Sequence, residues 1–259
     1  MENEKDVSIT QVSASVWQKA QEHEGYNWVF LNRRNGYLRL LKKFLRALKN
    51  PKQIWLYFKF KDFYCGDDWN YWWLKAFDNY RVLPKHFDKA LEVGSGPYSN
   101  IRLISKLVDI KDIYCTDPLM FAYLGLRMTW VSEMARKKKI YASVGKAEKI
   151  DFPDNMFELV VCNNVLDHVE DTDACFREMF RVLKRGGYFV FGQDLSNEKD
   201  LERPSWKNDD LHPIKLHHVY LDSVIDPVCE DKYKKITSRG EGRHPEQNYG
   251  NYIYIGQKK

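Results

Sequence analysis

The stretch LEVGSGPYSN, residues 91–100, decides the fold of this chain. A short apolar run, Ala90–Val93, is followed by two glycines one residue apart, Gly94 and Gly96. A strand that ends in Gly-x-Gly lets the backbone turn sharply and lets a ligand approach where a Cβ atom would block it. A helix that follows such a turn points its unbonded N–H groups at that ligand. The stretch therefore predicts a strand, a ligand-binding turn and the start of a helix.

Strand and helix patterns alternate from Lys89 onward, which predicts an α/β fold with a largely parallel sheet covered on both faces. We expect strands over Ala90–Val93, Asp112–Thr116, Ile140–Val144, Phe157–Cys162, Tyr188–Phe191, Lys232–Ser238 and Asn251–Gly256. We expect helices over Asn100–Val108, Leu119–Lys138, Thr172–Lys184 and Pro213–Ile225.

Composition places the chain among ordinary globular proteins. Its 259 residues, 44% hydrophobic and 30% charged, suffice for one large domain or one domain with an appendage. We find no run of about 18 consecutive apolar residues, and the N-terminal MENEKDVSIT lacks the apolar core of a secretory signal. The scattered cysteines never form a CxxC pair, so we expect reduced thiols, a cytoplasmic location and no metal site: Cys65, Cys115, Cys162, Cys175 and Cys229.

The N-terminal region differs from the rest of the chain in composition and in its pattern of apolar residues. Residues 1–24 read as a loose or weakly helical lead-in, and Tyr37–Leu48 shows the apolar face of a helix. A strongly aromatic stretch follows, ending in a helix over Asp67–Tyr80. Between Gly25 and Lys61 there are ten Lys or Arg and no Asp or Glu, so the net charge of +5 belongs to this segment.

Downstream motifs give the Gly-x-Gly turn its meaning. Asp117 lies 23 residues after Gly94, at the end of the second expected strand, where a carboxylate accepts both hydroxyls of a ribose. The blocks FPDNMFELVVCNNVLDHVED and FREMFRVLKRGGYFVF follow. Over residues 88–194 the chain resembles the class I S-adenosylmethionine-dependent methyltransferases that act on small molecules, lipids and sugars.

The resemblance implies a Rossmann-like, three-layer α/β/α fold: a seven-stranded, mostly parallel sheet with an antiparallel last strand and an N-terminal helical cap. It implies a cap or lid region over residues 1–84 and a cofactor-binding methyltransferase domain over 85–259. The donor would be S-adenosyl-L-methionine and the second product S-adenosyl-L-homocysteine.

The resemblance also assigns residues to the cofactor. Glu92 and the backbone of Gly94, Ser95 and Gly96 would lie against its methionine end, and Asp117 would hold its ribose. The positions expected around the adenine and beneath the sulfonium are Pro118, Leu119, Ala147, Glu148, Asn163 and Asn164. Tyr98 and Lys146 depart from the family pattern, which often has a glycine at the first position and an acidic residue at the second.

A dinucleotide-binding oxidoreductase is the competing interpretation of the glycine turn. Its fingerprint needs Gly or Ala where this chain has Ser99, which disfavours it. Methylation of exocyclic amines in DNA is also disfavoured, because Asn163 is followed by Asn164-Val165 and not by a Pro-Pro-aromatic run. Cytosine C5 chemistry is disfavoured because Val161, not proline, precedes Cys162.

Candidate general acids or bases lie at the expected ends of strands. They are His168 and Asp194, and a later histidine, His212, would lie on the acceptor side. Each is open to a structural interpretation as a hydrogen-bonded loop residue. In this family the stretch before the first strand often builds a lid, so the lid candidates are Trp69, Tyr71 and Trp72, with core packing as the alternative.

The preferred acceptor is a hydroxyl of a small molecule or a sugar, including a surface-glycan or lipid-linked intermediate. RNA methylation and a non-catalytic cofactor-binding regulator stay open as alternatives. The basic segment 33–61 has three interpretations: a solvated helix packed on the domain, a peripheral contact with an anionic membrane, or a grip on nucleic acid phosphates.

Overall fold

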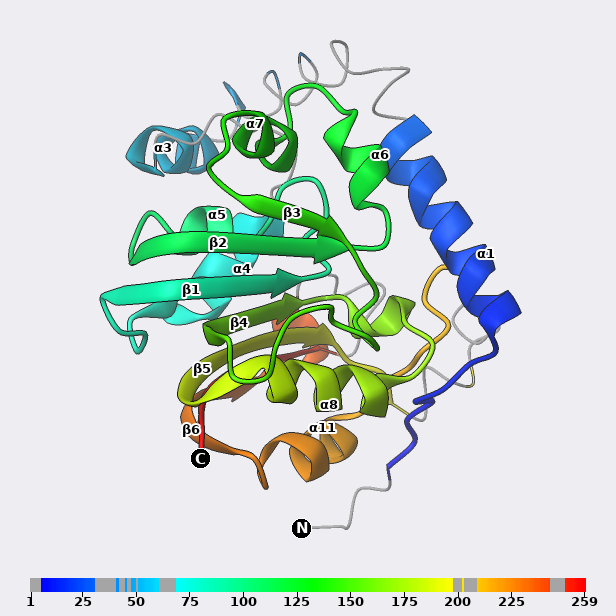
Figure 1. Cartoon of the computed structure of the whole chain (residues 1–259). Helices are drawn as coiled ribbons and strands as arrows, with labels where there is room; N and C mark the ends of the chain where they lie inside the picture. Colours follow the sequence, from blue (N-terminus) through cyan, green and yellow to red (C-terminus); the bar gives the residue numbers. More distant parts are fainter. Residues whose placement is uncertain are drawn as a thin grey trace.

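The computed structural model describes residues 6–30, 51–60, 69–197, 209–242 and 250–259, and the single positions 41, 45, 48, 49 and 202. Seven strands form one sheet in the order β3-β2-β1-β4-β5-β7-β6 (Figure 1). They are β1 His86–Val93, β2 Asp109–Asp117, β3 Tyr141–Val144, β4 Phe157–Asn163, β5 Leu183–Asp194, β6 Cys229–Ile236 and β7 Asn251–Lys258. Strand β7 pairs antiparallel with both β5 and β6, and the remaining pairs are parallel. The predicted sheet and its antiparallel last strand are confirmed.

Helices cover both faces of the sheet and complete the three layers. One face packs against α4 Trp69–Ala76, α5 Ile101–Ile104 and α7 Trp130–Arg136, with α3 Pro51–Phe60 beyond them. The other face packs against α8 Thr172–Val182 and α11 His218–Ile225. The remaining elements are α1 Ala14–Gly25, α6 Met120–Leu124, η1 Tyr26–Phe30, η2 Asp78–Tyr80, η3 Leu166–His168 and η4 Arg239–Glu241.

Alternating side chains divide the core between the two faces. In β4, Leu159 and Val161 join the cluster beneath α4 and α5, whereas Val160 and Cys162 join the cluster beneath α8 and α11. All four side chains are fully buried. A central parallel strand covered on both faces needs such a continuous apolar run, with successive side chains pointing to opposite sides.

The expected helices over Leu119–Lys138, Asn100–Val108 and Pro213–Ile225 are much shorter than their patterns predicted. The run Leu119–Lys138 forms two helices, because α6 ends at Leu124 and the backbone becomes extended at Thr129 before α7 begins. Between them Met128 adopts a left-handed φ of 60°, which no helix interior accommodates. The other two expected helices shorten to α5 and α11.

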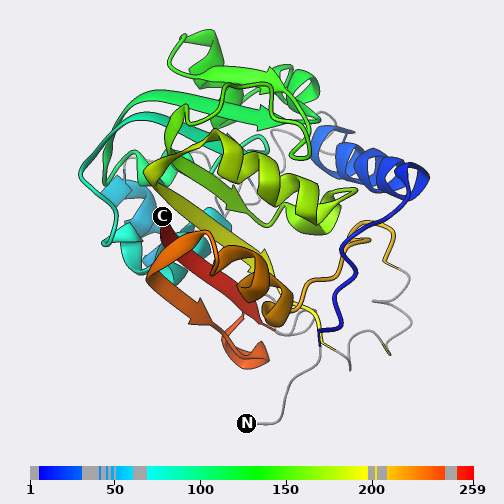
Figure 2. The same ribbon diagram turned by 60° about the horizontal axis from the view of Figure 1, so that its bottom comes forward.

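The N-terminal segment is better ordered than its composition predicted. The Ser13 hydroxyl caps α1 by accepting a hydrogen bond from the Val16 amide. Before it, Ile9 pairs with Lys215, and the Val12 amide donates to the Glu170 carbonyl at 2.9 Å. Figure 2 shows this segment running beside the chain that leads into α11. These contacts tie the N-terminal segment to the body of the molecule.

The aromatic helix α4 packs into the core. Tyr71 is 5% exposed and Trp73 is 2% exposed, both in the cluster that includes strand residues of the sheet. Trp72 packs edge-on against Trp73 with ring centroids 4.9 Å apart. The side chain of Trp69 lies outside the described residues. Because α4 shares one core with the strands, the proposed boundary at residue 84 does not separate two hydrophobic cores, and the domain division stays a prediction.

Most of the expected helix Tyr37–Leu48 lies outside the described residues. Three of its apolar side chains are described, and Leu41, Leu45 and Leu48 are each about half exposed. In the neighbouring α3, Trp55 and Phe58 are also more than half exposed. In the part of the chain that the structure describes, no helix has the length and apolar character needed to cross a bilayer. Peripheral membrane contact through the basic segment stays a prediction.

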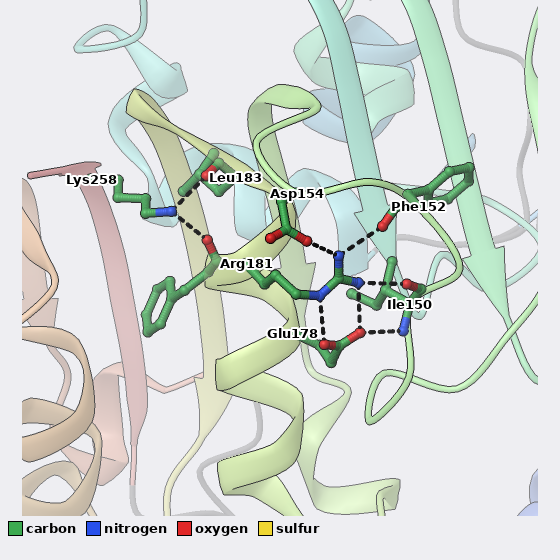
Figure 3. A network of polar contacts seen from close by, with 8 residues as sticks. Ile150, Phe152, Asp154, Glu178, Arg181, Leu183 and Lys258 are labelled. Carbon is green, nitrogen blue, oxygen red and sulfur yellow. Dashed lines mark hydrogen bonds and ion pairs between the residues drawn. The ribbon is translucent and has the colours of Figure 1, made fainter.

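A polar network fixes the loop between β3 and β4 to α8 (Figure 3). The Arg181 guanidinium binds Glu178 and Asp154, with closest N–O distances of 2.7 and 2.6 Å, and donates to the Ile150 and Phe152 carbonyls. This partner holds the pKa of Glu178 below its ordinary value. From β7, the Lys258 ammonium donates to carbonyls at the carboxyl end of α8, where a helix leaves its C=O groups unbonded.

Gly192 tests whether α4 is seated in the core. A Cβ atom there would lie 2.6 Å from Cζ3 of Trp73 and 3.0 Å from Oδ1 of Asn163. We expect Gly192→Ala to lower the free energy of unfolding by about 1–3 kcal/mol, as overpacking does, measured by urea denaturation. The matched control is Gly240→Ala, whose Cβ would have nothing within 4 Å. A Gly192→Ala protein as stable as this control would show that Trp73 is not held against β5.

Candidate functional site

A cavity opens at the carboxyl ends of β1, β2, β3 and β4. About 510 Å³ of space not filled by protein atoms lies in it, a part of which is open solvent. Its walls are Trp17, Gln21, Glu24, Gly94, Gly96, Asp117, Pro118, Gly145, Ala147, Glu148, Asn164, Val165, His168 and Val169. The strand order reverses between β1 and β4, and open α/β sheets bind ligands at such a switch point.

The two glycines of the turn after β1 have different structural roles. Gly94 has a φ of +66°, and a Cβ atom there would lie 2.4 Å from a methyl carbon of Val165. Gly96 has a φ of +55°, and its Cβ would meet nothing within 4 Å. Both need the left-handed backbone that glycine adopts without strain. Gly94 thus permits close packing, and Gly96 leaves an open cradle on the cavity wall.

Asp117 lies in the cavity wall and links β2 to that turn. Its carboxylate accepts hydrogen bonds from the Gly96 amide at 3.0 Å and from the Leu119 amide at 2.8 Å. Burial, and then the nearby charge of Glu24, raise its pKa from 3.8 to about 7. A carboxylate offers about four lone-pair positions, so two acceptor positions stay for the hydroxyls of a ligand.

Glu92 lies beneath the turn and caps α5. Its carboxylate accepts from the amides of Asn100 and Ile101 at 2.7 and 3.1 Å, and from the Ser99 hydroxyl. Burial raises its pKa although these hydrogen bonds oppose the shift. Glu92 is absent from the described cavity wall, so it supports the loop on which a ligand would rest.

The other expected cofactor residues divide into two groups. Pro118, Ala147 and Glu148 line the cavity, whereas Ser95 and Leu119 are not among its described walls. Glu148 also accepts a hydrogen bond from the Glu170 amide at 2.7 Å, which orients its side chain.

The two asparagines after β4 face different surroundings. Asn164 lines the cavity at a φ of 58°, and its buried Oδ1 makes no hydrogen bond within the described residues. Asn163 lies behind it, close to Gly192. An unsatisfied buried acceptor at a cavity wall is what a ligand donor would satisfy. Asn164 therefore fits a polar ligand group here, as do the open backbone of Gly96 and the carboxylate of Asp117.

Helix α1 closes the outer side of the cavity with Trp17, Gln21 and Glu24, which sequence reasoning missed. Lys146 holds it there, with its ammonium 3.5 Å from the ring centroid of Trp17 and 2.8 Å from Glu170. The residue that departs from the family pattern thus fastens the helix. The signal was present in the sequence: Ser13 offers a cap, and the three wall residues recur at helical spacing.

The structure brings two of the three expected catalytic or acceptor-side residues together. His168 lines the cavity, and its ring lies 4.7 Å from that of His212, centroid to centroid. Burial alone would lower the pKa of His168, but the charges of Asp167 and Glu24 outweigh it and raise the pKa. Asp194 instead accepts a hydrogen bond from the side-chain Nδ2 of Asn251. It is not among the described cavity walls.

Comparisons with known proteins agree with this geometry. Residues 91–191 match the family model described as a methyltransferase domain. An uncharacterized methyltransferase of Schizosaccharomyces pombe is 34% identical over 111 residues, 40% of this chain and 39% of that protein. The ubiquinone/menaquinone biosynthesis C-methyltransferase UbiE of Vibrio cholerae is 49% identical over 99 residues, 38% of each chain. This chain therefore spans less than two fifths of these relatives' length.

Solved structures share the fold at low sequence identity. The phosphoethanolamine N-methyltransferase 2 of Haemonchus contortus, solved with S-adenosyl-L-methionine, aligns with a TM-score of 0.58 at 14% identity, covering 75% of this chain and 53% of that one. The YcgJ protein of Bacillus subtilis aligns with a TM-score of 0.53 at 14% identity, covering 73% of this chain and 99% of that one. The predicted Rossmann-like architecture is confirmed.

Replacing Glu24 tests the electrostatics of the cavity. We expect Glu24→Gln to lower the pKa of Asp117, because a repelling negative charge is removed, and to lower the pKa of His168, because an attracting one is removed. Carboxyl and imidazole NMR titrations measure both. The control is Glu22→Gln, an exposed glutamate on the same helix. Unchanged pKa values in Glu24→Gln would show that α1 does not bring its carboxylate to the cavity.

Proposed function

We propose that this chain, in which residues 91–191 form a methyltransferase domain of the class I superfamily, transfers a methyl group from S-adenosyl-L-methionine to a small-molecule acceptor. The observation that carries the proposal is the pairing of the open Gly96 backbone with the Asp117 carboxylate in one cavity wall. The acceptor loses a proton, gains the methyl group and leaves S-adenosyl-L-homocysteine as the second product.

The cavity residues fit the cofactor. Asp117 would accept the ribose hydroxyls, Pro118 and Ala147 would flank the adenine, and Gly96 and Asn164 would lie along the methionine end. The cofactor supplies a methyl group activated on a positive sulfonium. The chain supplies position and exclusion of water, since in-line displacement depends on both. Helix α1 covers the cavity from outside through Trp17 and Gln21.

The charge around the cavity favours a cation over a polyanion. Glu24, Asp117 and Glu148 line the cavity, and Asp167 is buried beside His168. Lys146, between the wall residues Gly145 and Ala147, is paired with Glu170. A sulfonium is attracted to such carboxylates, whereas the phosphates of RNA are repelled. This disfavours the RNA alternative.

The acceptor we propose is a hydroxyl of a small molecule or sugar placed beside His168. The histidine lines the cavity, and its backbone amide donates to the carbonyl of Val165, another wall residue, at 3.0 Å. A second candidate is an activated carbon, because UbiE proteins are named as C-methyltransferases and the Stenotrophomonas maltophilia one is 56% identical over 70 residues, 27% of this chain and 26% of that one. Either acceptor must lose a proton, so both require a polar group at this position.

Calorimetric titration with S-adenosyl-L-homocysteine tests the cofactor. We expect binding by the wild type and at least tenfold weaker binding by Asp117→Ala, a loss of about 1.4 kcal/mol or more. Below pH 7 the raised pKa leaves Asp117 protonated, so wild-type affinity should fall from pH 8 to pH 6. Glu24 and His168 lie nearby, and Asp117→Ala isolates the contribution of Asp117. A folded wild type that binds no S-adenosyl-L-homocysteine would remove the proposal.

Transfer from a donor with a deuterated methyl group tests the acceptor. A screen of sugars, phenols and quinols, followed by mass spectrometry and carbon NMR of the product, distinguishes oxygen from carbon methylation. We expect His168→Asn to reduce the transfer rate at least tenfold while S-adenosyl-L-homocysteine affinity stays within twofold, with His86→Asn as the exposed control. Cofactor binding without transfer to any acceptor would favour the non-catalytic regulator.

A further inference from the structure

We propose that Asp167, His168 and His212 form a binding site for a divalent transition-metal ion beside the cofactor cavity. One ligand atom from each of the three side chains lies within 4.8 Å of the other two. The absence of a CxxC pair predicted no metal, but that argument concerns thiolate ligands and says nothing of imidazole and carboxylate. Two imidazoles and one carboxylate make a recurrent metal-binding set.

The spacing fits shared ligation better than direct bonding. The His168 Nε2 atom lies 3.7 Å from Asp167 Oδ1, too far for a hydrogen bond. Two ligands on one tetrahedral ion with bonds of about 2.1 Å lie about 3.4 Å apart. Rotation of the side chains would shorten the separations between the ligand atoms, which are at most 4.8 Å, to this value. The separation of the His168 and Asp167 atoms therefore fits two ligands of one ion better than a hydrogen bond.

An unsatisfied buried oxygen points to a missing partner. Asp167 Oδ1 is buried and makes no hydrogen bond within the described part of the chain. The Asp167 side chain is 10% exposed and that of His168 is 14% exposed. A buried charged oxygen without a donor costs free energy. A cation beside Asp167 would remove this cost.

An outer carboxylate orients the imidazole of His212. Asp209 Oδ2 lies 2.6 Å from His212 Nδ1, which makes Nε2 the ligating atom of that ring. Glu24 Oε2 lies 4.0 Å from His168 Nδ1, on the side of the ring away from Asp167. Metal-binding histidines commonly face a carboxylate through their second nitrogen, which fixes the ring and strengthens the ligand.

The backbone brings these residues together from distant parts of the chain. Asp167 and His168 belong to η3, the single turn after β4, and His212 precedes α11. The Ile214 amide donates to the Asp167 carbonyl at 3.3 Å and ties the two segments. This hydrogen bond holds the loop that carries His212 against η3.

The proposed role of the ion rests on the proposed function. His168 lines the cofactor cavity, so an ion on its Nε2 would lie at the acceptor side with coordination positions left open. An acceptor hydroxyl bound there would have its pKa lowered. Its proton passes to solvent, its oxygen takes the methyl group, and S-adenosyl-L-homocysteine leaves. The oxidation state of the metal ion does not change.

Metal binding is tested on the full chain after treatment with a chelator. We expect cobalt(II) to bind with a visible absorption spectrum of nitrogen and oxygen ligands, and zinc(II) to bind in calorimetry. Asp167→Asn and His212→Ala should each weaken both metals at least tenfold. The matched control is His86→Ala, because His86 is an exposed histidine between Asp88 and Asp109 at the other end of the sheet. It should bind as the wild type does.

The proposal is overturned by no binding of either metal at micromolar concentration, or by binding that both site variants retain. A sulfur-to-cobalt charge-transfer band would assign the ion to cysteines and also overturn it. Circular dichroism and S-adenosyl-L-homocysteine affinity check that each variant folds. Because these ligand titrations are separate, metal binding fails or succeeds independently of the proposed methyl transfer.

Discussion

Two buried carboxylates hold the loop that follows β1, and the cavity depends on them. Glu92 accepts the amides of Asn100 and Ile101 from below, and Asp117 accepts the amide of Gly96 from the neighbouring strand. Burying a carboxylate costs free energy unless hydrogen bonds compensate it. Here the compensation comes from loop amides that would otherwise stay unbonded. The same hydrogen bonds therefore stabilise the two carboxylates and fix the position of the loop. The cradle at Gly96 is thereby formed before a ligand arrives.

The charges around the cavity make cation binding and proton release linked events. Burial and the charge of Glu24 raise the pKa of Asp117, so in the unliganded protein near pH 7 a part of its carboxyl groups carry a proton. Because this pKa is above the ordinary 3.8, ionising Asp117 costs folding stability as the pH rises from about 4 toward 7. A positive ligand stabilises the ionised form and lowers that pKa. The binding of a sulfonium would thus release protons, and a neutral analogue would release fewer.

Contiguous motifs were predictable, and contacts between distant segments were not. The glycine turn and the acidic strand end at Asp117 are short local motifs, so the strand and helix pattern and the family resemblance together predicted the sheet and one side of the cavity. The position of α1 depends on Lys146, which is distant in sequence. Aromatic composition fits a lid as well as a core, and only the structure shows that the side chains of Tyr71 and Trp73 are buried in the core. The approach of His212 to His168 likewise needs the fold.

Helix α1 joins the two halves of the cavity. Glu24 acts on Asp117, the proposed ribose ligand, and Gln21 donates at 3.2 Å to the carbonyl of His168, the residue proposed to face the acceptor. A movement of α1 that opened the cavity would break the Gln21 contact and withdraw the Glu24 carboxylate from both Asp117 and His168. Closure over a cofactor would then restore the surroundings of His168 in the same step. Since a methyl donor exposed to water is wasted, ordering the acceptor side only when the cofactor side is covered gives such a helix a physical advantage.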